Sequence, residues 1–113
     1  MAVTESRVGD TVIFTPGPEV DVRTLPGFEA RVDALLASGS RRFVFDLSAV
    51  VLLPSTVAGF LVSCAVRVRK AGGRLAIAAP SQRITRTLST LGVGAVLSVR
   101  DSLAAAITFV TEG

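Results

Sequence analysis

Residues 43–60, FVFDLSAVVLLPSTVAGF, combine a strand, a loop and the start of a helix. The first three residues are apolar and include aromatic and β-branched side chains, which is typical of a buried strand. The later triplet Pro54-Ser55-Thr56 is typical of the first residues of a helix. In α/β proteins, the loops after the carboxyl ends of strands are where ligands and partners usually bind. We therefore expect the functional residues of this chain in this stretch.

The length of 113 residues allows one domain, residues 1–113, and half of the residues are apolar, which is enough for one core. The longest apolar stretch, residues 57–66, is well short of the roughly 20 residues that a membrane-spanning helix needs. The N-terminus has no basic segment followed by a cleavage site. We therefore expect a cytoplasmic protein that does not have a membrane as its partner.

The charged residues exclude several kinds of function. Twelve Lys and Arg against nine Asp and Glu give a net charge of +3, and no Tyr or Trp is present to stack on bases. Nucleic acid is therefore not an expected partner. The chain has no histidine, no P-loop, no Gly-x-Gly-x-x-Gly motif and no metal-ligand spacing. We predict no catalytic residue, no metal and no cofactor.

Two further candidates for chemistry are weak. Cys64, the single cysteine, lies among apolar helix residues and is interpreted as a core residue rather than a reactive thiol. Thr56 and Asp21 could serve as nucleophile and base only if a third group oriented them, and the sequence offers none. We therefore predict that the protein is not an enzyme.

Turn residues and hydrophobic periodicity predict the other elements. We expect a hairpin of strands 2–7 and 11–15, then strands 43–45, 74–78 and 95–99. Helices are expected from about Leu25 until Gly39, over residues 55–70, from Ser81 until Gly92, and after Asp101 or Ser102. This order predicts an α/β fold with a mixed, mostly parallel sheet, an N-terminal antiparallel hairpin and about four helices.

The helix over residues 55–70 carries one narrow line of small or polar residues among apolar ones: Thr56, Gly59, Ser63, Arg67 and Lys70. The small side chains at 59 and 63 would let another chain approach closely. Phe60, beside this line, could serve as an apolar anchor for a partner. The alternative is that this line is the ordinary polar face of a surface helix.

Two adjacent hydroxyls stand at the start of the same helix. Either Ser55 or Thr56 is predicted to be the N-cap, which explains one hydroxyl but not both. A phosphate at this point would be favoured by the free N–H groups and the positive end of the helix dipole. It would also add about −1.5 to −2 charges to the surface that a partner meets.

Four short motifs follow one another along the chain: Glu19-Val20-Asp21, Asp46-Leu47-Ser48-Ala49-Val50, Lys70-Ala71-Gly72-Gly73-Arg74-Leu75, and Pro80-Ser81 with Leu91-Gly92. Over nearly the whole length they resemble the STAS domain family, whose best-known members are the bacterial anti-sigma factor antagonists. The first three are similar to that family's Gly-Glu-Leu-Asp, Asp-Leu-Ser-x-Val and Gly-Gly-Lys/Arg-Leu motifs. The resemblance implies a single STAS-like domain.

The family's central pattern, Asp-Ser-Ser/Thr-Gly-Leu-Gly, falls on residues 54–59. By that match, Thr56 takes the position of the hydroxyl that the partner kinase phosphorylates, with Ser55 beside it, and Asp21 matches the acidic residue of a nearby loop. Pro54 replaces the acidic residue of the pattern and Val57 its first glycine. Two alternatives follow from the resemblance: phosphorylation at Thr56, or a docking surface that has lost the switch.

The leading hypothesis is a regulatory module that docks onto an anti-sigma factor or a related serine/threonine kinase. The predicted contact residues are Asp21, Ser55, Thr56, Gly59, Phe60, Ser63 and Arg67. The alternative is a STAS scaffold without phosphorylation, which would be an assembly subunit of a sensory complex and would form a homo-oligomer.

Overall fold

The computed structural model describes residues 3–94 and 96–112. Its elements in chain order are β1 (Val3–Val8), β2 (Thr11–Pro16), the 3₁₀ turn η1 (Val22–Thr24), α1 (Leu25–Ala37), β3 (Arg42–Asp46), α2 (Ser55–Lys70), β4 (Arg74–Ala78), α3 (Gln82–Thr90), β5 (Ser98–Arg100) and α4 (Leu103–Thr111). None of these helices is long and apolar enough to cross a membrane.

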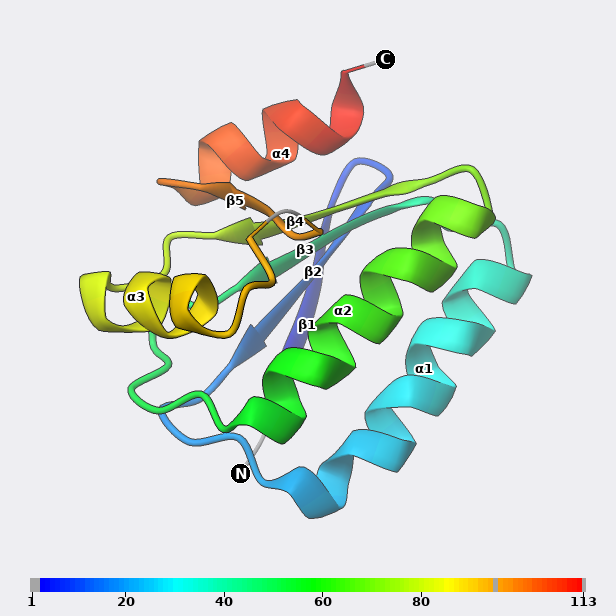
Figure 1. Cartoon of the computed structure of the whole chain (residues 1–113). Helices are drawn as coiled ribbons and strands as arrows, with labels where there is room; N and C mark the ends of the chain where they lie inside the picture. Colours follow the sequence, from blue (N-terminus) through cyan, green and yellow to red (C-terminus); the bar gives the residue numbers. More distant parts are fainter. Residues whose placement is uncertain (1–2, 95, 113) are drawn as a thin grey trace.

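The strands of the described residues form one sheet in the order β1-β2-β3-β4-β5 (Figure 1). β1 and β2 are antiparallel, with Val3 opposite Pro16 and Val8 opposite Thr11. The other neighbours are parallel, because a helix crosses over between each pair. The predicted α/β fold with its mixed sheet, N-terminal hairpin and four helices is therefore confirmed.

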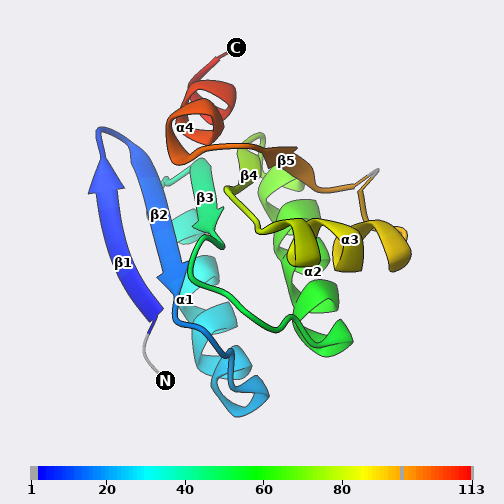
Figure 2. The same cartoon turned by 90° about the vertical axis from the view of Figure 1, so that its left-hand side faces the viewer.

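The sheet lies between two helical layers (Figure 2). The helices α1, α2 and α3 pack on one face, and α4 packs on the other. In the middle strand β3, Phe43 and Phe45 point into the larger core under α1 and α2, whereas Val44 points to α4. All three side chains are buried. The prediction of a buried strand is confirmed, and its two faces are both covered, as in the middle of a parallel sheet.

The bounds of two strands differ from the prediction within the described residues. β1 covers Val3–Val8 instead of residues 2–7, and residue 2 lies outside the described residues. β5 begins at Ser98 rather than at Ala95, which also lies outside them. The chain before β5 turns at Val93, whose carbonyl oxygen accepts a hydrogen bond from the N–H of Leu97 at 3.0 Å. The side chain of Leu97, which follows this turn, is buried. A buried side chain just before β5 explains why the sequence before Ser98 resembled a strand.

The helix ends follow local chemistry. The hydroxyls of Ser81 and Ser102 each accept a hydrogen bond from the backbone N–H three residues on, at 3.2 and 3.1 Å, and so cap α3 and α4 as predicted. Gly39 and Gly72 have φ of +104° and +86° and end α1 and α2 in the left-handed conformation that glycine adopts readily. The predicted stop positions of these two helices are confirmed.

Candidate docking surface

The loop after β2 and the loop after β3 meet at the carboxyl edge of the sheet. The N–H of Val51 donates to the carbonyl oxygen of Pro18 at 2.9 Å, and Glu19 and Leu52 form an isolated parallel bridge. The second loop leads directly into α2. Residues 17–24, residues 47–54 and the first turn of α2 therefore form one surface, which we call the candidate docking surface.

The loop after β3 presents apolar side chains to solvent. Val50 and Leu53 are buried and anchor the loop in the core, whereas Val51 and Leu52 between them are 53% and 49% exposed. The backbone is fixed by a hydrogen bond from the N–H of Val50 to the carbonyl oxygen of Leu47 at 3.0 Å. Two exposed apolar side chains on an ordered loop are typical of a protein contact.

The start of α2 differs from the prediction. The N-cap is Pro54, in extended backbone (φ −60°, ψ 150°), and no side chain makes a capping bond. The N–H groups of Val57 and Ala58 donate to the carbonyl oxygen of Pro54, at 2.9 and 3.1 Å. The prediction that Ser55 or Thr56 is the N-cap was therefore wrong, because the helix already begins at Ser55. Both hydroxyls belong to exposed residues.

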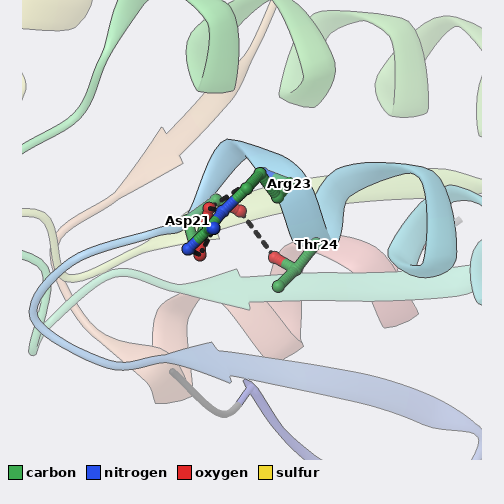
Figure 3. A network of polar contacts seen from close by, with 3 residues as sticks. All are labelled: Asp21, Arg23 and Thr24. Carbon is green, nitrogen blue, oxygen red and sulfur yellow. Dashed lines mark hydrogen bonds and ion pairs between the residues drawn. The ribbon is translucent and has the colours of Figure 1, made fainter.

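Asp21 holds the neighbouring loop in shape (Figure 3). Its carboxylate accepts hydrogen bonds from the backbone N–H of Arg23 at 2.9 Å and from the Arg23 guanidinium at 2.8–3.2 Å. The hydroxyl of Thr24 donates to the Asp21 carbonyl oxygen at 2.6 Å. The hydrogen bonds from Arg23 lower the pKa of Asp21 to about 2. Asp21 is thus a charged cap of η1 within the surface, and its carboxylate is already paired.

The predicted line of small and polar residues on α2 is only partly free. Thr56 and Gly59 are exposed, a Cβ placed on Gly59 would meet no atom within 4 Å, and Ser63 is half-buried. Arg67 forms ion pairs with Glu29 at 2.9 Å and Asp33 at 3.0 Å, both on α1. Arg67 therefore ties α2 to α1, and the accessible part of the line is its first half.

Phe60 is not on the surface. It is 8% exposed and contacts Phe28 of α1, with the ring centroids 5.4 Å apart in an edge arrangement. The same Phe28 ring lies 5.6 Å from that of Phe45 in β3. The prediction that Phe60 anchors a partner is corrected: α1 covers this side of α2, and Phe60 belongs to the core.

A family model for the STAS domain matches residues 2–106 of the chain. The chain belongs to the STAS domain family. No curated protein matches its sequence significantly.

Solved structures share this STAS fold. A protein of Thermotoga maritima described as an anti-sigma factor antagonist has a TM-score of 0.87 at 24% identity, covering 97% of this chain and 95% of that chain. An anti-sigma factor antagonist of Mycobacterium paratuberculosis has a TM-score of 0.79 at 23% identity, covering 98% and 94%. The phosphorylated form of the Bacillus cell fate determinant SpoIIAA has a TM-score of 0.75 at 16% identity, covering 96% and 99%. At these identities the likeness establishes the fold.

The Asp-Leu-Ser motif of this STAS domain has a local structural role. The carboxylate of Asp46 accepts a hydrogen bond from the N–H of Ser48 at 3.0 Å, which turns the chain out of β3. The side chain of Leu47 is buried, and its N–H donates to the carbonyl oxygen of Ala78 at 3.0 Å, next to the end of β4. The motif therefore sets the direction in which the loop with Val51 leaves the sheet.

Sequence reasoning missed the exposed apolar residues of the surface. Val51 and Leu52 were included in the stretch of interest without a role, and Val22 of η1, which is 43% exposed, was not singled out. The run of four apolar residues at 50–53 could have indicated them, because a loop of this length buries only some of its side chains.

The remaining chemistry of this STAS domain is sparse. Within residues 3–94 and 96–112, no three His, Cys, Asp or Glu side chains are grouped to hold a metal ion. Cys64 is fully buried, and burial raises its pKa to about 12, so its thiol stays protonated at neutral pH. What the surface offers is apolar contact area, two hydroxyls and a free helix start.

Proposed function

We propose that this STAS domain is a cytoplasmic regulator of the anti-sigma factor antagonist type, which docks onto an anti-sigma factor or a related serine/threonine kinase. The observation that carries the proposal is the exposure of Val51 and Leu52 beside Thr56 and Gly59, on loops whose neighbouring residues are buried. Exposed apolar side chains on a preordered backbone lose little conformational entropy on binding, which favours a protein contact. This role requires no catalysis by the domain itself.

The domain is also proposed to be switched by phosphorylation at Thr56, with Ser55 as the neighbouring acceptor. Both residues are exposed, and neither hydroxyl takes part in a hydrogen bond within the described residues. The N–H groups of Val57 and Ala58 are directed to Pro54, so those of Ser55 and Thr56 remain at the positive end of the helix to stabilise a phosphate. A phosphate there would place negative charge next to the apolar contact and weaken it.

Titration calorimetry with a purified anti-sigma factor tests the docking surface. Gly59→Trp and Leu52→Asp are each expected to weaken binding at least tenfold, because one fills the open space above α2 and the other puts a charge into the contact. Ala37→Trp is the matched control, since Ala37 is exposed at the far end of α1. Full binding by both test variants would exclude this surface.

The switch has a separate test. Thr56→Glu is expected to weaken binding, whereas Thr56→Ala is expected to leave it unchanged, because only the first mimics the charge. Mass spectrometry after incubation with the kinase and ATP should show one phosphate, which disappears in Thr56→Ala. An unmodified wild-type chain would refute the switch and leave the docking proposal standing.

The second candidate function is a STAS scaffold without a switch. It is supported by Pro54 and Val57, which stand where the family pattern has an acidic residue and a glycine. As an assembly subunit, the chain would form a homo-oligomer. Light scattering of the purified protein distinguishes the two candidates, because the switch-bearing regulator is expected to be a monomer.

A further inference from the structure

Charge is distributed unevenly along this chain. All nine acidic residues lie either before residue 47 or after residue 100, and the segment 47–100 contains seven Lys and Arg and no Asp or Glu. This segment forms α2, β4, α3 and β5, which lie together at the β5 end of the molecule, away from β1 (Figure 2). Residues 47–100 are therefore strongly basic, although the net charge of the whole chain is only +3.

The ion pairs make this contrast sharper. Within the described residues, carboxylates pair with Arg23, Arg31, Arg42 and Arg67. Only the last of these lies in the segment 47–100, and its partners belong to α1. The other six cations of the segment have no carboxylate at ion-pair distance in the described part of the chain: Arg69, Lys70, Arg74, Arg83, Arg86 and Arg100.

Three of these cations surround the open edge of the sheet at β5. Arg69 of α2 and Arg74 of β4 line a cavity of about 250 Å³ together with Phe109 of α4. The guanidinium carbons of Arg74 and Arg100 lie 5.0 and 4.2 Å from the centre of the Phe109 ring. Arg100 also lines a cavity of about 440 Å³ between α3 and β5, together with Thr85. We call Arg69, Arg74 and Arg100 the β5 belt.

A partner would contact the β5 belt with its side chains rather than with its backbone. The carbonyl oxygen of Arg100 accepts from the N–H of Ala79 on the β4 side at 2.9 Å, so the preceding carbonyl, that of Val99, faces the free edge. The Arg100 guanidinium covers this carbonyl at 2.9 Å. The edge is therefore partly closed to an added strand. The Arg74 guanidinium likewise donates to the carbonyl oxygen of Phe109 at 2.9 Å. The guanidinium nitrogens that these two bonds do not use remain for anionic side chains.

The chemistry also distinguishes a polypeptide from other anions. The Phe109 ring already has Arg74 and Arg100 over it, so no free aromatic face is available in the belt for stacking with a base. A second copy of this chain is a poor match, because most of its carboxylates are already paired with its own arginines.

We propose that the β5 belt binds an acidic segment of a partner protein, through Asp or Glu side chains that pair with Arg69, Arg74 and Arg100. Guanidinium and carboxylate groups match in a bidentate geometry, which suits three arginines held by three different elements. The belt lies along the β5 edge and does not include the loop of Val51 or the start of α2. This second site is therefore independent of the proposed docking surface.

Fluorescence anisotropy with a labelled hexaglutamate peptide tests the proposal. At 50 mM NaCl, Arg69→Gln/Arg100→Gln is expected to weaken binding about tenfold, because two charge-assisted contacts are lost. Arg7→Gln/Arg31→Gln removes the same charge from the β1 side, where Arg31 of α1 pairs with Glu5 of β1, and is expected to change binding less than about twofold. The single variant Arg69→Gln is expected to weaken binding about threefold. Arg69 is exposed and makes no side-chain hydrogen bond in the described structure, so a loss of binding in this variant cannot be due to unfolding.

Three outcomes would overturn the proposal. The first is no binding of hexaglutamate by the wild-type chain. The second is an equal loss of affinity in the belt variant and the charge-matched control, which would mean that only net charge matters. The third is tighter binding of a labelled oligothymidylate than of hexaglutamate, which would indicate nucleic acid instead. Gly59→Trp is expected to leave hexaglutamate binding unchanged, so this test does not depend on the docking surface.

Discussion

Replacing Gly73 by alanine tests the close approach of two backbone segments next to β4. The N–H of Arg74 donates to the carbonyl oxygen of Arg41 at 2.8 Å, where β3 and β4 begin to pair. A Cβ on Gly73 would overlap this carbonyl oxygen and lie 2.9 Å from its carbon and 3.0 Å from Cγ1 of Val68. Two of the three obstructing atoms are backbone, so a side-chain rotation cannot relieve the overlap.

The expected magnitude follows from these contacts. Moving the segments apart weakens one backbone hydrogen bond, which contributes about 1 kcal/mol. The overpacking against Val68 and the Arg41 backbone costs about 1–3 kcal/mol. The lower entropy of alanine in the unfolded chain offsets about 0.5–1 kcal/mol. Gly73→Ala is therefore expected to lower the free energy of unfolding by about 2 kcal/mol.

Urea denaturation measures this difference. The chain has no Trp or Tyr, so far-UV circular dichroism is the suitable probe. Two alanine variants separate steric from conformational effects. Gly27→Ala in α1 meets no atom within 4 Å and is expected to stabilise by about 0.5–1 kcal/mol. Gly72→Ala has open space but φ of +86°, and is expected to cost about 1 kcal/mol. If Gly73→Ala unfolded like the wild type, the steric argument would be refuted.

Three other predictions concern stability. Ala79 has φ of +52°, so Ala79→Gly is expected to stabilise by about 1 kcal/mol and to raise Tm by about 4 °C, and an unchanged Tm would contradict the strain. Phe60→Ala is expected to cost about 3 kcal/mol in urea denaturation, because Phe60 is a core residue; a surface anchor would cost little. The pKa of Asp21 is about 2 in the folded chain and 3.8 ordinarily. Because folding lowers this pKa, the Asp21–Arg23 pair stabilises the fold fully above about pH 4, and this stabilisation is lost as the pH falls from about 4 to 2. NMR titration of the Asp21 carboxyl checks this, and a pKa near 3.8 would disprove it.

The order of strands and helices could be predicted because its determinants are local. Prolines and glycines mark the turns, and the hydrophobic period changes from strand to helix within a few residues. The start of β5 could not be predicted in this way. Leu97 belongs to a turn and is nevertheless buried, and a buried turn has the same apolar composition as a short strand.

The residues of the candidate docking surface could be predicted only in part. The predictions that failed concern residues whose exposure and partners depend on tertiary packing. Helical spacing places Phe60 beside Thr56 and Ser63, but only the position of Phe28 on α1 shows which side is covered. Arg67 looked free because its partner Asp33 lies 34 residues earlier in the chain. The role of Ser55 as N-cap failed because Pro54, in extended conformation, takes that position.

The capping of α2 by the carbonyl oxygen of Pro54 has a consequence for how this chain can be regulated. Since the helix does not depend on either hydroxyl, Thr56→Ala is expected to keep the wild-type free energy of unfolding within about 0.5 kcal/mol. Thr56→Glu, like a phosphate, places negative charge at the positive end of the helix and is expected to raise that free energy by about 0.3–1 kcal/mol. A modified copy would therefore resist unfolding and proteolytic turnover at least as well as an unmodified one, so modification would weaken partner binding without shortening the lifetime of the protein.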